Sequence, residues 1–255
     1  MTGHDEMSTG APLWLELPPH RGGRPNRLLV FLHGAGSRPE TFMPVALAWQ
    51  FKFPGAVAIV LEGLSPARQG SGRNWFDGSG VAHEQAERVH HAAQEVVKRI
   101  RSAQESLQIA PSATMIVGFS QGASVGLEMA LLGDSCAAVV VAHAGRLHRA
   151  IAPGTIIEPS IHLLHGELDT HVLAQHSHRA YRMFREAGAR VSLDVLADGV
   201  HSIGQDMINI GTTRAMQTVF RARKRISLDQ FHVALAVSLD SDEPIHRGPP
   251  PILHH

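Results

Sequence analysis

The chain has little of three things: cysteine, net charge and long apolar runs. Its one cysteine, Cys136, cannot form an intramolecular disulfide, so the fold does not depend on an oxidising compartment. The 23 Lys and Arg residues balance 23 Asp and Glu residues, and a neutral chain lacks the field that holds nucleic acid or an anionic membrane. No stretch approaches the roughly 18 continuous apolar residues of a membrane span. We therefore expect no nucleic-acid partner and no integral membrane segment.

The first ten residues are polar and acidic and do not resemble a secretory signal, so a soluble cytoplasmic protein is expected. Histidine is abundant, with 18 residues, and its grouping raises the question of a metal site. The groups are His83, His90 and His91; His162 and His165; and His171, His176 and His178. No His-Glu-x-x-His or cysteine-pair motif accompanies them, so no metal is predicted.

Short runs rich in Val, Ile and Leu recur along the chain and predict strands. Some of them, such as Leu28-Leu-Val-Phe-Leu32, are apolar without alternation, which is typical of strands buried on both faces of a parallel sheet. The predicted strands are Leu13–Leu17, Leu28–Leu32, Ala56–Leu61, Thr114–Phe119, Ala137–Ala142, Ile161–Leu164 and Val191–Leu196.

Segments with helical spacing separate these strands, at about 41–50, 82–107, 121–132, 172–187 and 203–221. Repeated alternation of strand and helix predicts an α/β fold, a doubly wound and mostly parallel sheet with helices on both faces. No linker divides the middle of the chain, so residues 10–225 are predicted to form one catalytic domain. Residues 226–255, which end in a Pro-rich segment, are predicted to be a C-terminal extension.

Gly118-Phe-Ser-Gln-Gly122 matches the G-x-S-x-G pattern of a nucleophile elbow. In such an elbow a tight turn between strand and helix holds the serine exposed, and the flanking glycines avoid side-chain clashes. The bare match is weak, and an ordinary Gly-rich turn is the alternative. Its position directly after a predicted strand and directly before a predicted helix favours Ser120 as a nucleophile.

A serine nucleophile needs an imidazole base, and the imidazole needs a carboxylate that fixes its tautomer. Asp169 follows the strand Ile161–Leu164, and His201 follows the strand Val191–Leu196. Taken singly, Asp169 could cap a helix and His201 could be a surface histidine. Both nevertheless follow Ser120 in the order Ser, Asp, His of α/β hydrolases, and both come after strands that end at the same edge of the sheet.

The oxyanion of a tetrahedral intermediate needs two backbone N–H groups from different loops. We predict that one belongs to Gln121 and that Ala35, in the segment Leu32-His-Gly-Ala-Gly36, supplies the other. A flexible glycine turn is the alternative for that segment. Leu64, Trp75 and Phe76 are predicted to line the substrate pocket, although the two aromatic residues could instead anchor their Gly-rich loop.

Several segments together resemble the phospholipase/carboxylesterase family of α/β hydrolases, which includes acyl-protein thioesterases and small bacterial carboxylesterases. The matching segments are His33-Gly-Ala-Gly36, Trp75-Phe-Asp77, Gly118-Phe-Ser-Gln-Gly-Ala123, Gly145-Arg146, His165-Gly-Glu-Leu-Asp169 and Gly199-Val-His-Ser-Ile203. The resemblance spans residues 28–220. It implies Ser120, Asp169 and His201 as the catalytic triad, Ala35 and Gln121 as oxyanion donors, and no cofactor. The loop after Asp169 departs from the family, because it reads Thr-His-Val without the common proline.

The predicted function is therefore hydrolysis of a small-molecule carboxylic ester or thioester through an acyl-enzyme. A lysophospholipase or other lipid-acyl hydrolase is an alternative on the same fold, and a non-catalytic binding protein is an alternative of another class. The intact Ser120, Asp169 and His201 argue against the binding protein. The sequence does not decide the oligomeric state, and a homodimer is possible.

Overall fold

The computed structural model of the chain describes residues 14–221. The chain divides into two units, Met1–Ala215 and Met216–His255, and all the predicted site residues belong to the first. The predicted extension from residue 226 lies outside the described residues, so the domain boundary stays a prediction. No helix among residues 14–221 is long and apolar enough to cross a membrane.

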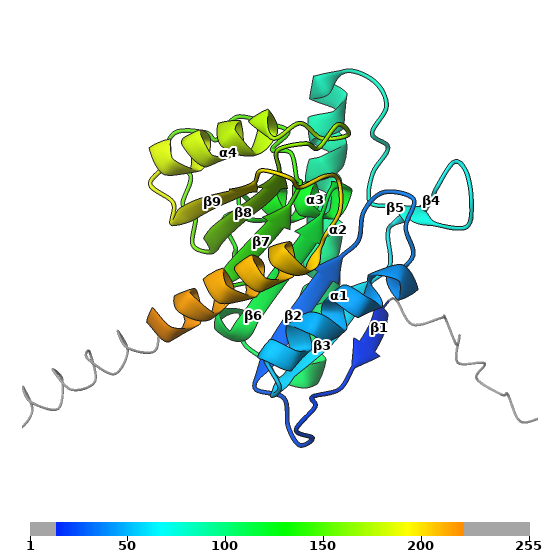
Figure 1. Cartoon of the computed structure of the whole chain (residues 1–255), viewed down its shortest axis with the longest axis vertical. Helices are drawn as coiled ribbons and strands as arrows, with labels where there is room; N and C mark the ends of the chain where they lie inside the picture. The colour runs from blue at the N-terminus through cyan, green and yellow to red at the C-terminus, as the bar shows by residue number, and fades with distance from the viewer. Residues whose placement is uncertain (1–13, 222–255) are drawn as a thin grey trace, which may run out of the picture. The chain divides into compact units, whose positions relative to one another are not determined.

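The first unit is built on a seven-stranded sheet in the order β1-β3-β2-β6-β7-β8-β9 (Figure 1). All neighbouring strands run parallel except β1, which pairs antiparallel with β3 at one edge. The strands are β1 (Trp14–Leu17), β2 (Arg27–Leu32), β3 (Ala56–Leu61), β6 (Thr114–Phe119), β7 (Val139–His143), β8 (Ser160–Gly166) and β9 (Val191–Leu196). The predicted mostly parallel sheet is confirmed.

Helices cover both faces of this sheet. Helices α2 (Ala82–Leu107) and α3 (Gln121–Met129) pack on one another, and α3 packs on β6 and β7. Helix α1 (Pro39–Lys52) and a further helix that begins at residue 205 come together on the opposite face, where Trp49 approaches Gly211 (Figure 1). Helix α4 (Gln175–Glu186) packs on β8 and β9.

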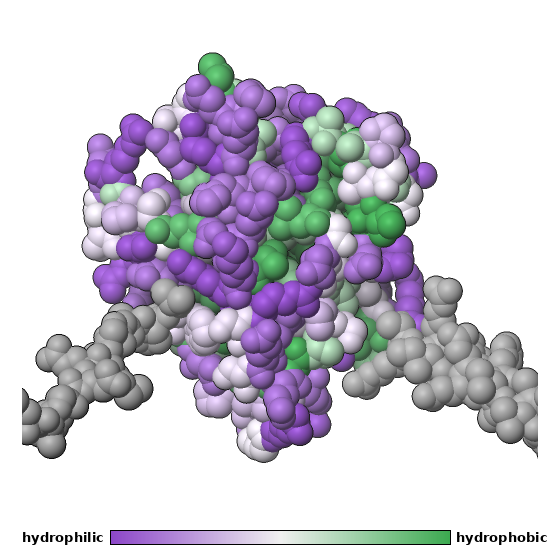
Figure 2. All heavy atoms as spheres, turned by 180° about the vertical axis from the view of Figure 1, so that it is seen from behind, coloured by the Kyte–Doolittle hydropathy of each residue, from purple (hydrophilic) through white to green (hydrophobic). Residues whose placement is uncertain are grey.

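The strands that the sequence marks by continuous apolar runs are the most buried. Every residue of β3 is buried, and Leu28 to Leu32 of β2 are completely so. A strand with helices on both faces has no solvent face, so it shows no polar alternation. On the exposed side of the molecule that carries α2, Figure 2 shows a hydrophilic band with hydrophobic patches on either side of it.

The predicted elements all exist, but several end elsewhere. Strand β7 is Val139–His143 rather than 137–142, and α3 ends at Met129 rather than residue 132, because the chain turns there towards Gly133 at φ +77°. Helix α4 begins at Gln175 rather than 172, since Asp169 holds the preceding backbone in a turn. The two-residue strands β4 (Ser65–Pro66) and β5 (Arg73–Asn74) and the short helix η1 (Pro111–Ala113) were not predicted.

Candidate active site

Ser120 stands between β6 and α3 with φ 54° and ψ −112°, a conformation that non-glycine residues rarely adopt. The neighbouring glycines explain how the turn closes. A Cβ at position 118 would lie 2.6 Å from the Cα of Ala123, and one at position 122 would lie 2.6 Å from the carbonyl oxygen of His33 and closer still to that of Leu32. Residues 118–122 therefore form the strained turn that the sequence predicts.

The side chains of Ser120, His201 and Asp169 form one chain of hydrogen bonds. The Ser120 hydroxyl lies 3.1 Å from Nε2 of His201 and can donate to it. Nδ1 of the same ring donates to Oδ2 of Asp169 at 2.7 Å. The three residues follow β6, β8 and β9, so the parallel strands bring them to one edge of the sheet from positions far apart in the sequence.

Asp169 is buried, with 2% of its surface exposed, yet its carboxylate is well satisfied. Oδ1 accepts the backbone N–H groups of His171 and Val172, each at 2.9 Å. Burial alone would raise the pKa of this carboxyl group, but the hydrogen bonds from His201 and from these two N–H groups outweigh it and hold the pKa below its usual range. The group that faces His201 is thus an ionised carboxylate, as a base-orienting residue must be.

His165 lies completely buried beside Asp169, and the sequence did not predict a place for it in the site. Its Nε2 donates to the carbonyl of Val172 at 2.6 Å and lies 3.4 Å from Oδ2 of Asp169. Its Nδ1 accepts from the hydroxyl of Ser177 at 2.6 Å. Burial lowers the pKa of His165, so the ring is neutral and serves to fix the turn that carries Asp169.

Two further rings contact His201. The centroid of Phe119 lies 4.8 Å and that of His171 lies 5.1 Å from the centroid of the His201 ring. Neither contact was predicted. Phe119 is the central residue x of the G-x-S segment and could have been suspected, whereas His171 stands in the loop that departs from the family pattern.

The loop of residues 33–36 lies against the nucleophile elbow. A Cβ on Gly34 would stand 3.0 Å from Cδ1 of Phe119 and 3.7 Å from Cβ of Ser120, so the loop packs closely on the elbow and a larger residue at position 34 would press on the Phe119 ring. Within residues 14–221, the backbone N–H groups of Ala35 and Gln121 donate no hydrogen bond to another protein group. Both remain available to a substrate atom, as oxyanion donors must be.

The side chain of Gln121 connects the elbow to the loop after β3. Its Oε1 accepts the N–H of Trp75, and its Nε2 donates to the carbonyl of Phe76, each at 2.7 Å. The indole N–H of Trp75 donates to the carbonyl of His33 at 2.8 Å. Trp75 therefore ties three loops of the site together.

The predicted pocket residues Leu64, Trp75 and Phe76 do line one cavity, of about 610 Å³. Its other wall is α2, and no triad residue lines it. Trp75 is 2% and Phe76 is 7% exposed, so both are anchors of their loop as well as cavity walls. Their place in a substrate pocket stays a prediction.

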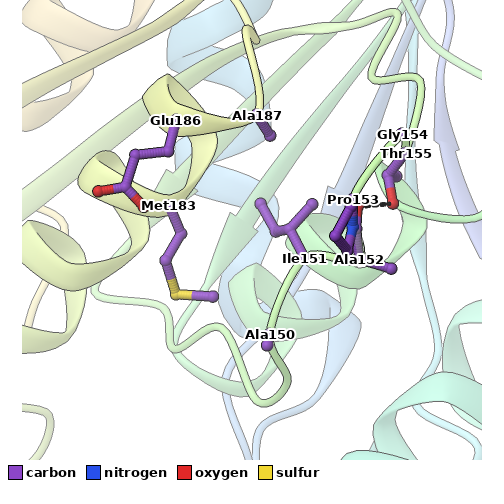
Figure 3. Close-up of a pocket in the computed structure, with 9 residues that line it drawn as sticks. All are labelled: Ala150, Ile151, Ala152, Pro153, Gly154, Thr155, Met183, Glu186 and Ala187. Carbon is purple, nitrogen blue, oxygen red and sulfur yellow. Dashed lines mark hydrogen bonds between the residues drawn. The ribbon is translucent and has the colours of Figure 1, made fainter.

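A second cavity, of about 640 Å³, lies between α4 and residues 150–155 (Figure 3). Met183 of α4 and Ile151 stand on its opposite sides, and no triad residue lines it. Among residues 14–221, no group of three or more His, Cys, Asp or Glu side chains is placed to hold a metal ion.

The family model described as Phospholipase/Carboxylesterase matches residues 20–213. The chain belongs to this family. It is a hydrolase of the carboxylesterase class on the α/β-hydrolase fold, and the predicted family, fold and enzyme class are confirmed. Esterase YpfH of Escherichia coli (strain K12) is 29% identical over 178 residues, which cover 69% of this chain and 76% of that protein.

Solved structures confirm the fold. Esterase PE8 aligns with a TM-score of 0.72 at 23% identity and covers 80% of this chain and 97% of its own. The carboxylesterase of Bacillus cereus aligns with a TM-score of 0.67 at 15% identity and covers 80% of this chain and 93% of its own.

Proposed function

We propose that Ser120, His201 and Asp169 are the catalytic triad of this esterase. His201 accepts the proton of the Ser120 hydroxyl as Oγ attacks the ester carbonyl carbon, and Asp169 stabilises the imidazolium that results. The imidazolium then gives this proton to the departing alkoxide or thiolate, which leaves an acyl-serine. Water, deprotonated by the same ring, releases the acid and restores the hydroxyl. The single observation that carries the proposal is the unbroken hydrogen-bond chain from Ser120 through His201 to Asp169.

The backbone N–H groups of Ala35 and Gln121 are proposed as the oxyanion donors. Ala35 lies in the loop that packs on the elbow, Gln121 is the first residue of α3, and neither N–H group is used within the described part of the protein. Donors held on a rigid backbone stabilise the negative charge of the tetrahedral intermediate without reorganising. The hydrogen bonds of Trp75 to the Gln121 side chain and to the His33 carbonyl fix the positions of the two donor segments relative to each other.

The proposed substrate is a small-molecule carboxylic ester or thioester with a short to medium acyl chain. No triad residue lines either of the two cavities described above, so neither of them is a long acyl tunnel that opens at Ser120. The proposed chemistry is complete within one chain, so it requires no homodimer. A series of p-nitrophenyl esters of increasing acyl length tests the size, and an optimum at long chains such as palmitoyl would favour the lipid-acyl hydrolase.

The triad is tested by Ser120→Ala and Asp169→Asn. Ser120→Ala removes the nucleophile and is expected to lower kcat by about a millionfold. Asp169→Asn is expected to lower kcat by about ten-thousandfold, because the amide favours the wrong tautomer of His201. Ser102→Ala, an exposed serine of α2, is the matched control and should keep full activity. A fluorophosphonate probe should label the wild-type protein and the control but not the Ser120 variant. Retention of more than about a tenth of the activity by a folded Ser120→Ala protein would overturn the proposal.

A further inference from the structure

Arg146 is held next to the nucleophile through its backbone. The segment after β7 runs against the first turn of α3, where a Cβ on Gly145 would lie 2.7 Å from Cβ of Ala123. The N–H of Arg146 donates to Oγ of Ser124 at 3.0 Å, and the same hydroxyl donates to the carbonyl of Ser120 at 3.2 Å. Two hydrogen bonds thus connect the Arg146 backbone to Ser120, and this places a long cationic side chain at the edge of the site.

The charge of Arg146 is not balanced locally. Within residues 14–221 its guanidinium forms no ion pair and no hydrogen bond, although the residue is half-buried. Arg149, three residues further on, shows the contrast: its Nε lies 2.7 Å from the buried carboxylate of Glu128. A half-buried arginine without a carboxylate partner is a ready site for an anion, because a guanidinium binds carboxylates and phosphates through a fork of N–H donors.

Two imidazoles share the surroundings of Arg146. His148 packs edge-on against Phe76 with ring centroids 5.5 Å apart, and His176 stands in the first turn of α4. Burial, followed by the positive charge of Arg146, lowers the pKa of His148 to about 4. Burial followed by the charge of Arg146 also lowers the pKa of His176. At neutral pH both rings are therefore neutral, and each offers one N–H donor beside a fixed positive charge.

These three residues lie on segments next to those of the catalytic groups: Arg146 and His148 follow β7, which lies between β6 and β8 in the sheet, and His176 follows the loop of Asp169. Phe76, which His148 contacts, is bonded to the side chain of Gln121. His176 lies seven residues after Asp169 and feels the charge of both Arg146 and His165, the ring beside Asp169. The backbone of Arg146 is thus joined to that of Ser120, and its positive charge acts on His148 and His176.

We propose that Arg146, with His148 and His176 as neutral donors, binds an anionic group of the substrate, so that the enzyme prefers esters that carry a carboxylate. The inference rests on the proposed function, because it places the anion on the molecule whose ester carbonyl meets Ser120. A neutral ester of the same length leaves the guanidinium without a partner. A charged one gains a charge-assisted hydrogen bond in both the ground state and the transition state, which lowers KM and raises kcat/KM.

The test compares esters matched in length. On the acyl side, kcat/KM is measured for mono-4-nitrophenyl adipate and for 4-nitrophenyl hexanoate, which differ in the terminal carboxylate. On the leaving-group side, 4-carboxyphenyl acetate is compared with phenyl acetate. The wild-type enzyme should favour the charged member of at least one pair by about tenfold, and the pair that does so shows which half of the ester meets Arg146.

Arg146→Gln should lower that charged-to-neutral ratio by about tenfold, and Arg146→Lys, which keeps the charge without the fork, should restore part of it. Arg182→Gln, an exposed arginine of α4, makes the same change in net charge and should leave the ratio within about twofold. If Arg146→Gln does not fold, competitive inhibition of 4-nitrophenyl hexanoate hydrolysis by hexanoate in the wild-type enzyme replaces it, with uncharged hexanamide as the comparison; equal inhibition by the two would overturn the inference. Hydrolysis of the neutral esters with no preference for charge in either pair overturns the inference alone, whereas no hydrolysis of any ester overturns the proposed function as well.

Discussion

The imidazole ring of His171 is stacked on that of His201, with ring centroids 5.1 Å apart and an angle of 21° between the planes. The backbone N–H of the same His171 donates to Oδ1 of Asp169, whose other oxygen holds His201. One residue of the loop after β8 therefore touches both the proposed base and the proposed orienting carboxylate. The backbone contact is independent of the side chain, so the two roles can be separated by substitution.

We expect His171→Ala to lower kcat by about three- to tenfold, because a stacked ring pair contributes about 0.5–1.5 kcal/mol to holding the plane of His201. His171→Phe keeps a ring at this position and should retain most of the activity. Steady-state kinetics with a neutral p-nitrophenyl ester measures both, and the loss should fall on kcat rather than KM. Equal losses in the alanine and phenylalanine variants would show that the ring contact has no positioning role.

The second prediction concerns the side chain of Gln121, which bonds Trp75 and Phe76 while its backbone N–H is proposed for the oxyanion. Gln121→Ala removes two hydrogen bonds worth about 0.5–1.5 kcal/mol each and should loosen the loop that carries Trp75 and Phe76. We expect kcat/KM to fall by roughly five- to hundredfold. Gln121→Glu keeps an acceptor for Trp75 but sets a carboxylate oxygen against the carbonyl of Phe76. It should therefore be impaired too, and kinetics of both variants beside their urea unfolding curves would show whether the fold or the site is affected.

A third prediction separates two glycines of α3. Gly122→Ala would drive a Cβ into the carbonyl oxygens of Leu32 and His33, so we expect a loss of several kcal/mol in the free energy of unfolding or an inactive protein. Gly126→Ala is the matched control, because a Cβ there meets only side-chain atoms at 3.5 Å and alanine is the better helix former by about 1 kcal/mol. The control should be neutral or stabilised in urea unfolding. A normal Gly122→Ala enzyme would contradict the account of the elbow.

Much of the site could be predicted from the sequence because parallel strands gather their carboxyl ends at one edge. Ser120, Asp169 and His201 each follow a recognisable apolar strand, and the G-x-S-x-G spacing fixes the turn at the first of them. The mutual positions of these three residues then follow from topology. Their hydrogen bonds need no knowledge of side-chain packing elsewhere.

The contacts around the triad could not be predicted in this way. The side chains of His171 and Gln121 contact residues that are distant in the chain, whereas His165 bonds to the nearby Val172 and Ser177. The directions of all three side chains depend on rotamers that no periodicity encodes. The position at which α4 begins could not be predicted either. Helical spacing continues back to residue 172, but the two backbone bonds to Asp169 hold residues 171 and 172 in a turn instead.

The last prediction concerns acid stability and His143, which ends β7 and is fully buried. Neither ring nitrogen has a hydrogen-bond partner among the described residues. Burial lowers the pKa of His143 to about 3, whereas in the unfolded chain a histidine titrates near pH 6.5. Between these values the unfolded chain binds a proton that the folded chain does not, so the free energy of unfolding falls as the pH decreases from about 6.5 towards 3.

His143→Leu removes this titration without removing a hydrogen bond, so its stability at pH 7.5 should stay close to that of the wild type. At pH 5 the variant should be the more stable protein by about 2 kcal/mol, because one proton no longer favours the unfolded chain. Urea unfolding at the two pH values measures the difference, with the exposed His178→Gln as a control that should follow the wild type at both. His148, whose pKa is lowered to about 4, still titrates in the variant, so the acid destabilisation should be reduced and not abolished. Parallel pH dependence of wild type and His143→Leu would show that His143 is protonated in the folded protein.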